Sequence, residues 1–575
     1  MSSPFANGMR PRALAVAVVL TAWFVLILGR LVHLQVFEHA RLKSDVLSQS
    51  QNEIAVYPTR GTITDRNGKI LARSLPVESV YFSPVRTEPP ARQMEQIARL
   101  RGILDLTAKD LARIGARVEK RSGYILVKRK ADPDAAARAM ALGIKGLFLQ
   151  EESKRFYPQG SLAAHVLGGV GIDDNGLAGA ELQYDRLLEG EKGKRLLMLD
   201  ARRRSYSFET IAAAKPGQDL RLTIDETIQY IAESELEKAV TATGAKWGTV
   251  VVMDSSTGEI LALANAPSYA PGDYPPEPEV GRNQAIARNF EPGSTFKIVT
   301  AAAARACGRI GFGEIYDCRK GSIMVGGAAV RDHKPLGILD FSGVFVESSN
   351  VGTIMIAQEI GARGLYDMVR SFRFGEKTGI DLPGEEQGVV HPLSTWRTSS
   401  FRVAIGYEVS VTAIQVLRAM NAYATRGFLV RPHIALDRPA GDAGSEAAVF
   451  PEKVADELVP VFEAVVEEGT GKPARLEGFD IAGKTGTAQK VDRAIGAYSS
   501  RLHLASFVGF VPAGRPALSM IVVIDEPQGT LQYGGQVAAP VFREIAARVL
   551  RYLRVVPKTA PPALITASLA QGSRP

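Results

Sequence analysis

The chain has 575 residues, of which 46% are hydrophobic and 23% are charged, a composition that excludes a disordered or fibrous protein. Its mean hydropathy is near zero, which excludes a protein built from many membrane spans. The net charge of +8 is too small for a nucleic-acid-binding protein of this length, and two cysteines and seven histidines leave little material for a metal cluster or a disulfide framework.

The first predicted element is a membrane-spanning helix. An uncharged run from Ala13 to Gly29, extended by the apolar residues up to Leu34, approaches the roughly 20 residues that cross a bilayer. A cleaved signal peptide is the alternative, but no Ala-x-Ala cleavage site follows the run. We therefore expect an uncleaved signal anchor over residues 13–35, after a cytoplasmic tail over residues 1–12. The long downstream part is expected to cross the membrane whatever its flanking charges.

A non-catalytic module is predicted over residues 45–215. Residues 91–116 have the periodicity of two amphipathic helices, and residues 124–127 resemble a strand. Asp132 and Pro133 are typical of the cap and the first residue of a further helix. We interpret the basic side chains of this module as a solvated face, with attraction to anionic lipid or an anionic polymer as the alternative.

A second domain is predicted over residues 216–556, where the apolar patterning strengthens. Strand patterns occur at both of its ends, with helices between them: a hairpin over 247–263, strands over 503–511 and 518–525, and a final helix from about 540 to 553. This order indicates an α+β domain whose sheet unites its two ends. The tail over residues 557–575 is rich in alanine, serine and proline, and we expect it to be disordered.

The stretch from Phe290 to Lys297 carries the first candidate catalytic residues. Its Pro-Gly pair ends one element and an Ala-rich apolar run follows, so Ser294 is predicted at a helix N-terminus with Lys297 one turn later on the same face. A buried neutral lysine can act as the base for a serine hydroxyl, and the N–H groups of the first turn can stabilise an oxyanion. The alternative is that Ser294 only caps the helix and that Lys297 is exposed to solvent.

Two later motifs favour the catalytic interpretation. Ser348-Ser349-Asn350 lies 54 residues after Ser294, and Lys484-Thr485-Gly486 lies another 136 residues further on. The order Ser-x-x-Lys, Ser-x-Asn, Lys-Thr-Gly occurs in class A β-lactamases and penicillin-binding proteins. A second Lys-Thr-Gly begins at Lys377, but a proline-containing, loop-like run follows it. We choose Lys484, because apolar strands follow it and an edge strand there can border a cleft.

Other hydrolase classes find no support in the motifs. No Gly-x-Ser-x-Gly occurs, which counts against an α/β-hydrolase, and no His-Glu-x-x-His spacing occurs, which counts against a metal hydrolase. We therefore expect neither a metal nor a cofactor. Cys307 and Cys318 could pair in an oxidising compartment, but we favour Cys307 as a buried small residue.

Further motifs lie along almost the whole chain: Arg60-Gly61 with Asp65-Arg66-Asn67-Gly68, Tyr157-Pro158, Ala164-His165-Val166-Leu167-Gly168, Gly179-Ala180-Glu181, Phe290-Glu291-Pro292-Gly293-Ser294-Thr295, Lys484-Thr485-Gly486-Thr487-Ala488 and Tyr533-Gly534-Gly535. Together with the anchor, they resemble the class B penicillin-binding proteins, and most closely the division-specific, FtsI-type septal peptidoglycan transpeptidases. The resemblance implies a penicillin-binding, serine β-lactamase-like domain, in which helices flank an antiparallel sheet. It also implies an N-terminal pedestal domain of the dimerisation type and one transmembrane helix.

The resemblance also implies a D,D-transpeptidase with a serine acyl-enzyme. The implied catalytic residues are Ser294, Lys297, Ser348 and Asn350, and the implied substrate-binding residues are Lys484, Thr485, Gly486 and Thr487. Ser294 would attack the carbonyl between the two terminal D-alanines of a stem peptide, and Lys297 would accept the serine proton. Ser348 would relay that proton, and Asn350 would hold the substrate amide. Lys484 and Thr485 would bind the terminal carboxylate, beside an oxyanion hole formed by the backbone N–H groups of Ser294 and Thr487.

The implied setting is the bacterial inner membrane, with the catalytic domain in the periplasm. The implied partners are peptidoglycan stem peptides, β-lactams, a membrane-embedded peptidoglycan glycosyltransferase and other division proteins, with no nucleic acid. An elongation-specific transpeptidase is the alternative within the family, and a catalytically dispensable division scaffold is the alternative of a different class. The long segment before the catalytic region counts against a β-lactamase.

Overall fold

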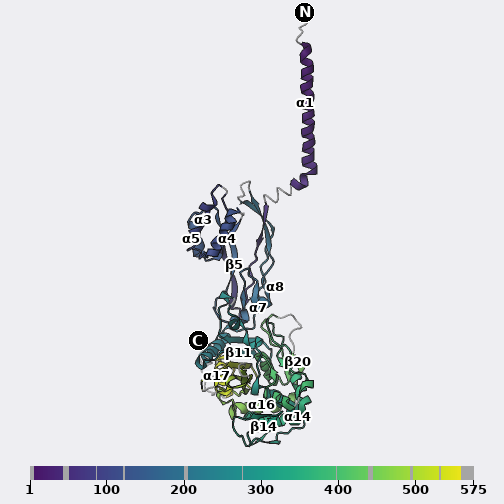
Figure 1. Ribbon diagram of the computed structural model, residues 1–575. Coiled ribbons are helices and arrows are strands. Elements are labelled where there is room, and N and C mark those ends of the chain that lie inside the picture. Colours follow the sequence, from purple (N-terminus) through teal and green to yellow (C-terminus); the bar gives the residue numbers. More distant parts are fainter. Residues whose placement is uncertain are drawn as a thin grey trace, which may run out of the picture. The chain divides into compact units, whose positions relative to one another are not determined.

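The computed structural model describes residues 6–42, 51–85, 87–120, 124–199, 205–274, 276–396, 398–437, 445–492, 496–529 and 532–558. The chain forms two compact units (Figure 1). The first unit comprises residues 1–59, 76–153 and 190–217, and the second comprises residues 60–75, 154–189 and 218–575. Segments 60–75 and 154–189, which lie within the predicted module, therefore group with the second unit. Most of the predicted disordered tail, residues 559–575, lies outside the described residues.

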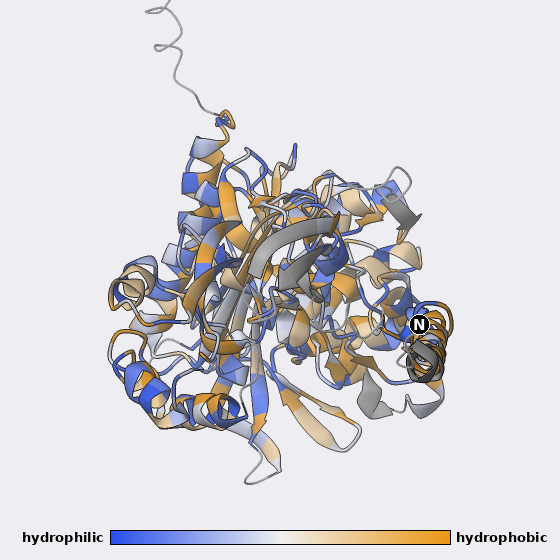
Figure 2. Cartoon of the chain, turned by 90° about the horizontal axis from the view of Figure 1, so that it is seen from above, coloured by the Kyte–Doolittle hydropathy of each residue, from blue (hydrophilic) through white to orange (hydrophobic). Residues whose placement is uncertain are grey.

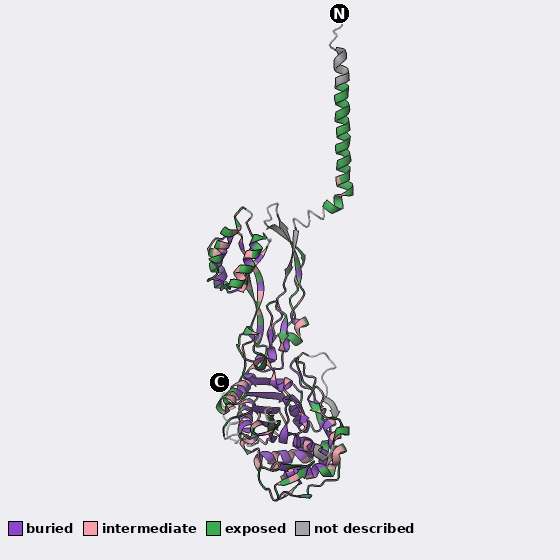
Figure 3. Ribbon diagram, viewed as in Figure 1, coloured by how far each residue is buried: buried purple, intermediate pink, exposed green. Residues whose placement is uncertain are grey.

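An apolar helix stands at the N-terminus of the first unit. α1 (Ala6–Val32) continues into the short π-helix η1 (His33–Phe37), and residues Ala13–Phe37 are long and apolar enough to span a membrane. Their 25 residues correspond to about 37 Å of helix, enough for a hydrocarbon core of about 30 Å. Most of its large hydrophobic side chains are exposed (Figures 2 and 3). These findings confirm the predicted apolar helix.

The rest of the first unit contains the elements predicted from periodicity and capping. The two amphipathic helices are α3 (Pro90–Ala98) and α4 (Ala108–Glu119), and the next elements are β4 (Ile125–Ala131) and α5 (Pro133–Ala141). Asp132 caps α5, as predicted, by accepting hydrogen bonds from the N–H groups of residues 134 and 135. A separate three-stranded sheet is formed by β1 (Gln51–Val56), β8 (Gly193–Leu199) and β9 (Ser205–Ala212).

Two strands, β3 (Ile70–Phe82) and β5 (Leu147–Phe156), contribute residues to both units. Within the first unit, the end of β3 pairs with β4, and Val80 and Phe82 pack with Ile97 and Ile114 in a small core. Apolar burial of this kind stabilises a folded module by roughly 25 cal/mol per Å² of apolar surface removed from water.

The second unit is built on a five-stranded antiparallel sheet with the order β12-β11-β23-β22-β21. The strands are β12 (Ile260–Ala266), β11 (Trp247–Asp254), β23 (Leu518–Asp525), β22 (Ala497–Val511) and β21 (Ala482–Asp492). Strands from the start and the end of the predicted catalytic domain lie side by side in this sheet. The α+β fold with an antiparallel sheet flanked by helices is thereby confirmed.

Helices cover both faces of this sheet, whose strands are largely buried (Figure 3), and alternate residues of β11 enter different cores. Val250 and Val252 pack with α9 (Glu226–Thr243) and α17 (Gly534–Tyr552). Val251 and Met253 belong to the other core, which includes residues of the following helices: α12 (Lys297–Ala306), α13 (Phe341–Val346), α14 (Asn350–Ser371), α15 (Ala413–Ala424) and α16 (Glu452–Glu467).

Shorter elements complete the second unit: β2 (Ile63–Thr64), α6 (Ala164–Leu167), β6 (Gly169–Val170), β7 (Gly176–Ala178), α7 (Gly179–Gln183), α8 (Asp185–Leu188), β10 (Leu220–Arg221), η2 (Pro271–Asp273), α10 (Pro278–Gly281), α11 (Gln284–Ala287), η3 (Gly293–Phe296), β13 (Ile315–Asp317), β14 (Ser322–Val325), β15 (Ala328–Arg331), β16 (Ile338–Asp340), β17 (Val389–Val390), η4 (Leu393–Thr395), η5 (Thr398–Ile405), β18 (Val409–Ser410), β19 (Phe428–Val430), β20 (Ser445–Ala448) and η6 (Lys472–Ala474).

Two expectations were wrong in detail. α17 begins at Gly534, before the predicted start near Pro540, so Pro540 lies inside the helix, where it removes one backbone hydrogen bond. Cys307 is exposed and Cys318 is the buried cysteine, and both thiols are free. Cys307 follows the last residue of α12, where the chain leaves the apolar core.

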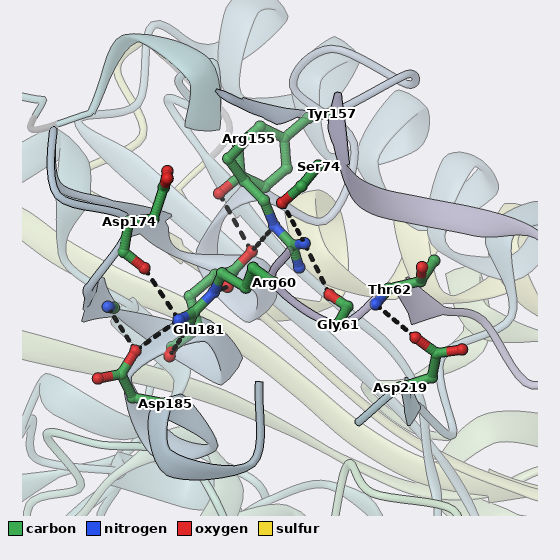
Figure 4. Close-up of polar contacts among 11 residues, drawn as sticks. Arg60, Gly61, Thr62, Ser74, Arg155, Tyr157, Asp174, Glu181, Asp185 and Asp219 are labelled. Atoms are coloured by element: carbon green, nitrogen blue, oxygen red, sulfur yellow. Dashed lines mark hydrogen bonds and ion pairs between the residues drawn. The ribbon is translucent and has the colours of Figure 1, made fainter. Parts of the chain in front are cut away.

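A buried ion-pair network explains the motifs around Arg60 and Glu181 in the second unit (Figure 4). The carboxylate of Glu181 pairs with Arg60 Nε and with Arg155 Nε, each at 2.7 Å. These three side chains are at most 1% exposed. Arg60 also pairs with Asp185, and Tyr157 Oη donates a hydrogen bond to Glu181. Segments far apart in the sequence are therefore joined at one carboxylate.

We predict that Glu181→Gln lowers the free energy of unfolding by about 3–5 kcal/mol, because it removes the carboxylate between two buried guanidinium groups and leaves Arg60 with Asp185 as its remaining counter-charge. Urea unfolding of the full chain in detergent measures this loss. Glu279→Gln is the matched control, since Glu279 pairs with Arg288 but is 66% exposed, and it should change the free energy by less than about 1 kcal/mol. Equal small effects of the two variants would contradict the prediction.

Candidate active site

Ser294 lies in the turn η3 (Gly293–Phe296), which leads directly into α12. Gly293 has a φ of +56° and donates its N–H to Gly406 O at 3.1 Å. A Cβ at Gly293 would lie 3.0 Å from Thr487 O, so the glycine lets this turn approach strand β21 closely. The structure therefore places Ser294 at the start of a helix, as predicted, and beside β21.

Lys297 is the first residue of α12 and is completely buried. Its Nζ donates hydrogen bonds to Ser348 O at 2.6 Å and to Asn350 Oδ1 at 2.8 Å, and it lies 3.3 Å from Ser348 Oγ. Burial lowers the pKa of Lys297 to about 7, and the opposing effect of the Asp332 charge is smaller. Near neutral pH, a large fraction of Lys297 is therefore an uncharged amine.

Ser348 lies in a strained turn between α13 and α14. Its φ is +56°, a left-handed conformation that is costly for a residue with a side chain and that clusters at functional sites. The next residue, Ser349, caps α14 by accepting a hydrogen bond from Gly352 N at 3.0 Å. The two neighbouring hydroxyls have different partners: that of Ser348 accepts from Lys484, and that of Ser349 bonds to Gly352 N and Asp332.

Lys484 reaches the same hydroxyl from the sheet. It lies on β21, is completely buried, and donates hydrogen bonds to Ser348 Oγ at 2.9 Å and to Thr485 O at 3.2 Å. Burial and then the neighbouring charge of Lys297 hold the pKa of Lys484 well below its usual range. A helix and a strand thus bring two lysine amines to one serine hydroxyl.

The remaining motif residues lie on β21, the edge strand of the sheet. A Cβ at Gly486 would meet Ser506 Oγ at 2.4 Å and Thr295 Cγ2 at 2.7 Å, so only glycine fits beside the nucleophile turn. Thr487 Oγ1 accepts a hydrogen bond from Gly534 N at 3.0 Å. Among the described residues, β22 is the only strand that pairs with β21, so the other side of its backbone has no strand partner.

The structure thus brings together residues that the sequence placed in three separate motifs. Hydrogen bonds connect Lys297, Ser348, Asn350 and Lys484, and close packing brings the Ser294 turn against Gly486 and Thr487. The alternative Lys-Thr-Gly at Lys377 lies outside any helix or strand, and Lys377 is exposed.

Asp332 is a residue of this site that sequence reasoning missed. Its carboxylate accepts hydrogen bonds from Asn350 N at 2.5 Å, Val351 N at 3.1 Å and Ser349 Oγ at 2.8 Å. It therefore fixes the first turn of α14, where a negative charge is also favoured by the helix dipole. No local motif marks Asp332, because its partners follow it by 17–19 residues.

Glu291 is a second missed residue, three positions before Ser294. It accepts hydrogen bonds from Tyr498 Oη at 3.0 Å and from Glu408 N at 2.8 Å, which ties the nucleophile turn to β22. Burial raises the pKa of Glu291 above its ordinary value. Its place in the Phe-Glu-Pro-Gly-Ser-Thr motif was the available signal. Within the described part of the chain, no group of three or more His, Cys, Asp or Glu side chains could hold a metal ion.

Family models match most of the chain. The model described as "Penicillin binding protein transpeptidase domain" matches residues 248–547, and that described as "Penicillin-binding Protein dimerisation domain" matches residues 55–222. Stage V sporulation protein D of Bacillus subtilis is 35% identical over 571 residues, which cover 96% of this chain and 87% of that protein. Peptidoglycan D,D-transpeptidase FtsI of Escherichia coli is 33% identical over 543 residues, which cover 92% of this chain and 90% of that protein.

Solved structures of penicillin-binding proteins also match the chain. Penicillin binding protein 3 of Mycobacterium tuberculosis, in a complex with aztreonam, matches with a TM-score of 0.66 and 29% identity over 88% of this chain and 99% of that one. The ampicillin complex of the same protein matches with a TM-score of 0.66 and 28% identity over 88% of this chain and 98% of that one. The chain belongs to the class B penicillin-binding proteins, which combine a dimerisation domain with a transpeptidase domain.

Proposed function

We propose that Ser294 is the nucleophile with which this chain cross-links peptidoglycan stem peptides. The chain is a peptidoglycan D,D-transpeptidase, as its family and relatives indicate. The assignment of residues rests on one observation. Lys297 Nζ and Lys484 Nζ both lie within hydrogen-bond distance of Ser348 Oγ, and Lys297 directly follows the turn that contains Ser294. Such a cluster gives a serine hydroxyl both a base and a proton relay.

In the acylation step, the uncharged amine of Lys297 accepts the proton of Ser294 as Ser294 Oγ bonds to the carbonyl carbon between the two terminal D-alanines. The backbone N–H groups of Ser294 and Thr487 stabilise the oxyanion. The C–N bond then breaks, and the proton returns through Ser348 Oγ to the nitrogen of the departing D-alanine. The amine of a second stem peptide attacks the acyl-enzyme, loses a proton and restores the hydroxyl of Ser294.

Substrate binding in this proposal uses the edge strand. Lys484 and Thr485 bind the carboxylate of the terminal D-alanine, and Gly486 lets the peptide lie close to the strand. Binding of that carboxylate raises the pKa of Lys484, because an opposite charge favours the ammonium form. Asn350 holds the substrate amide through its side chain, whose Oδ1 accepts from Lys297 and whose Nδ2 donates to Arg331 O.

β-Lactams are proposed to acylate the same serine, in agreement with the aztreonam and ampicillin complexes of the mycobacterial relative. We also propose that α1 anchors the protein in the bacterial inner membrane, with the N-terminus in the cytoplasm and the catalytic domain in the periplasm. The proposed domains remain the non-catalytic module over 45–215 and the transpeptidase domain over 216–556. A membrane-embedded glycosyltransferase would supply the glycan strands that this domain cross-links.

The site assignment predicts that Ser294→Ala abolishes labelling of the full chain by a fluorescent penicillin, because the acyl bond can no longer form. Gel fluorescence after denaturation measures the covalent label. Ser371→Ala is the control, since Ser371 is exposed and its hydroxyl donates only to a carbonyl of its own helix. It should label like the wild type. Full labelling of Ser294→Ala would contradict the assignment.

We further propose that the enzyme acts at the division septum, on the basis of its Phe-Glu-Pro-Gly-Ser-Thr and Tyr-Gly-Gly motifs and its similarity to FtsI. Depletion of the protein should then give filamentous cells, because septal cross-linking stops while elongation continues. Microscopy of depleted cells measures the outcome. Round cells would instead favour an elongation enzyme, and division sustained by the Ser294→Ala variant would favour a catalytically dispensable scaffold.

A further inference from the structure

Thr470 lies in the turn that follows α16, beside the Lys-Thr-Gly segment of β21. Its hydroxyl oxygen lies 2.7 Å from that of Thr485. The turn is tightly enclosed, because a Cβ at Gly469 would lie 2.3 Å from Val346 O and a Cβ at Gly535 would lie 2.5 Å from Thr470 O. Backbone packing therefore holds the turn that contains Thr470 in place.

Only one of the two hydroxyl protons can lie in the hydrogen bond between Thr470 and Thr485. A threonine hydroxyl carries one O–H donor and two acceptor lone pairs. When Thr470 donates to Thr485 Oγ1, the proton of Thr485 is left for another acceptor. Thr485 is 6% exposed, and among the described residues its hydroxyl has Thr470 as its hydrogen-bond partner. The carboxylate of a bound substrate would supply an acceptor for the remaining proton.

The hydroxyl oxygen of Thr487 also lies next to a hydrogen-bonding group, and here the donor is known because it is a backbone N–H. Gly534 N–H donates to Thr487 Oγ1 at 3.0 Å, which leaves the proton of that hydroxyl free as well. Thr485 and Thr487 lie two residues apart on β21, so their side chains share one face of the strand. When Thr470 is the donor, the strand carries two hydroxyls that each accept a hydrogen bond from the protein and can donate to an anion, which needs donors only.

We propose that Thr470 is a positioning residue for carboxylate recognition. Its hydroxyl donates to Thr485 Oγ1 and so turns the proton of Thr485 toward the terminal carboxylate of the donor stem peptide. The inference rests on the proposed function, in which Lys484 and Thr485 bind that carboxylate. Because Thr470 acts only through Thr485, its loss should weaken the recognition of the carboxylate and leave the chemistry at Ser294 unchanged.

The test compares benzylpenicillin, which has a carboxylate, with its methyl ester, which does not. The second-order rate constant of acylation is measured for both compounds with the full chain in detergent. Thr470→Val should lower the rate for the acid about fivefold, the equivalent of one hydrogen bond worth about 1 kcal/mol, and leave the rate for the ester within about twofold. Thr470→Ser, which keeps the hydroxyl, should restore the acid-to-ester ratio.

Two further variants complete the design. Thr425→Val is the matched control, because Thr425 follows α15 as Thr470 follows α16, and its hydroxyl bonds only to backbone carbonyls. It should leave the acid-to-ester ratio unchanged. The double variant Thr470→Val/Thr485→Val should have the same ratio as Thr485→Val, because coupled residues are not additive.

The outcomes separate this inference from the function on which it rests. If Thr485→Val lowers the acid-to-ester ratio and Thr470→Val does not, the inference is overturned and the proposed function stands. If Thr485→Val leaves the ratio unchanged, both the carboxylate role of Thr485 and the inference fail. An equal loss for acid and ester in Thr470→Val is a packing defect and also overturns the inference. Thr470→Ala, which likewise lacks the hydroxyl, gives the same comparison if the valine variant does not fold.

Discussion

Two lysine amines, buried without any exposure, share the hydroxyl of Ser348. Removing a cation from water is costly, so burial lowers the pKa of each lysine, and the neighbouring charge of Lys297 lowers the pKa of Lys484 further. An amine in an ordinary exposed lysine is protonated at neutral pH and cannot accept a proton. The chemistry proposed for Ser294 therefore depends on this burial, and the burial depends on the exact approach of a helix, a turn and a strand.

The second unit contains several features that make this approach possible. Gly293 and Gly486 lie where any side chain would collide with the neighbouring backbone or hydroxyl. Ser348 is held in a left-handed conformation, and its neighbours are fixed by the carboxylate of Asp332. The strain at Ser348 is stabilised by the packed helices on either side of it. Helices cover both faces of the sheet, and β21 lies at its edge, where it is proposed to bind a peptide substrate.

The sequence was sufficient for the α+β class, the apolar N-terminal helix and the three motifs, because each of these depends on local patterns. Capping by Asp132 and the alternation along β11 are examples in which neighbouring residues determine the element. Asp332 and Thr470 could not be predicted in the same way. Each acts on a residue at least 15 positions away, and nothing in the residues around them signals that contact. The exposure of Cys307 was missed because it depends on where α12 leaves the core, which composition does not specify.

The pH dependence of acylation tests the central claim most directly. A pKa of about 7 means that Lys297 is protonated below this pH and uncharged above it, so only the higher range provides the base. The rate constant of acylation by benzylpenicillin should therefore fall about tenfold per pH unit below pH 7 and stay level above it. A rate that continues to rise toward pH 10, as for an ordinary lysine, or that does not change between pH 5 and pH 9, would contradict this account.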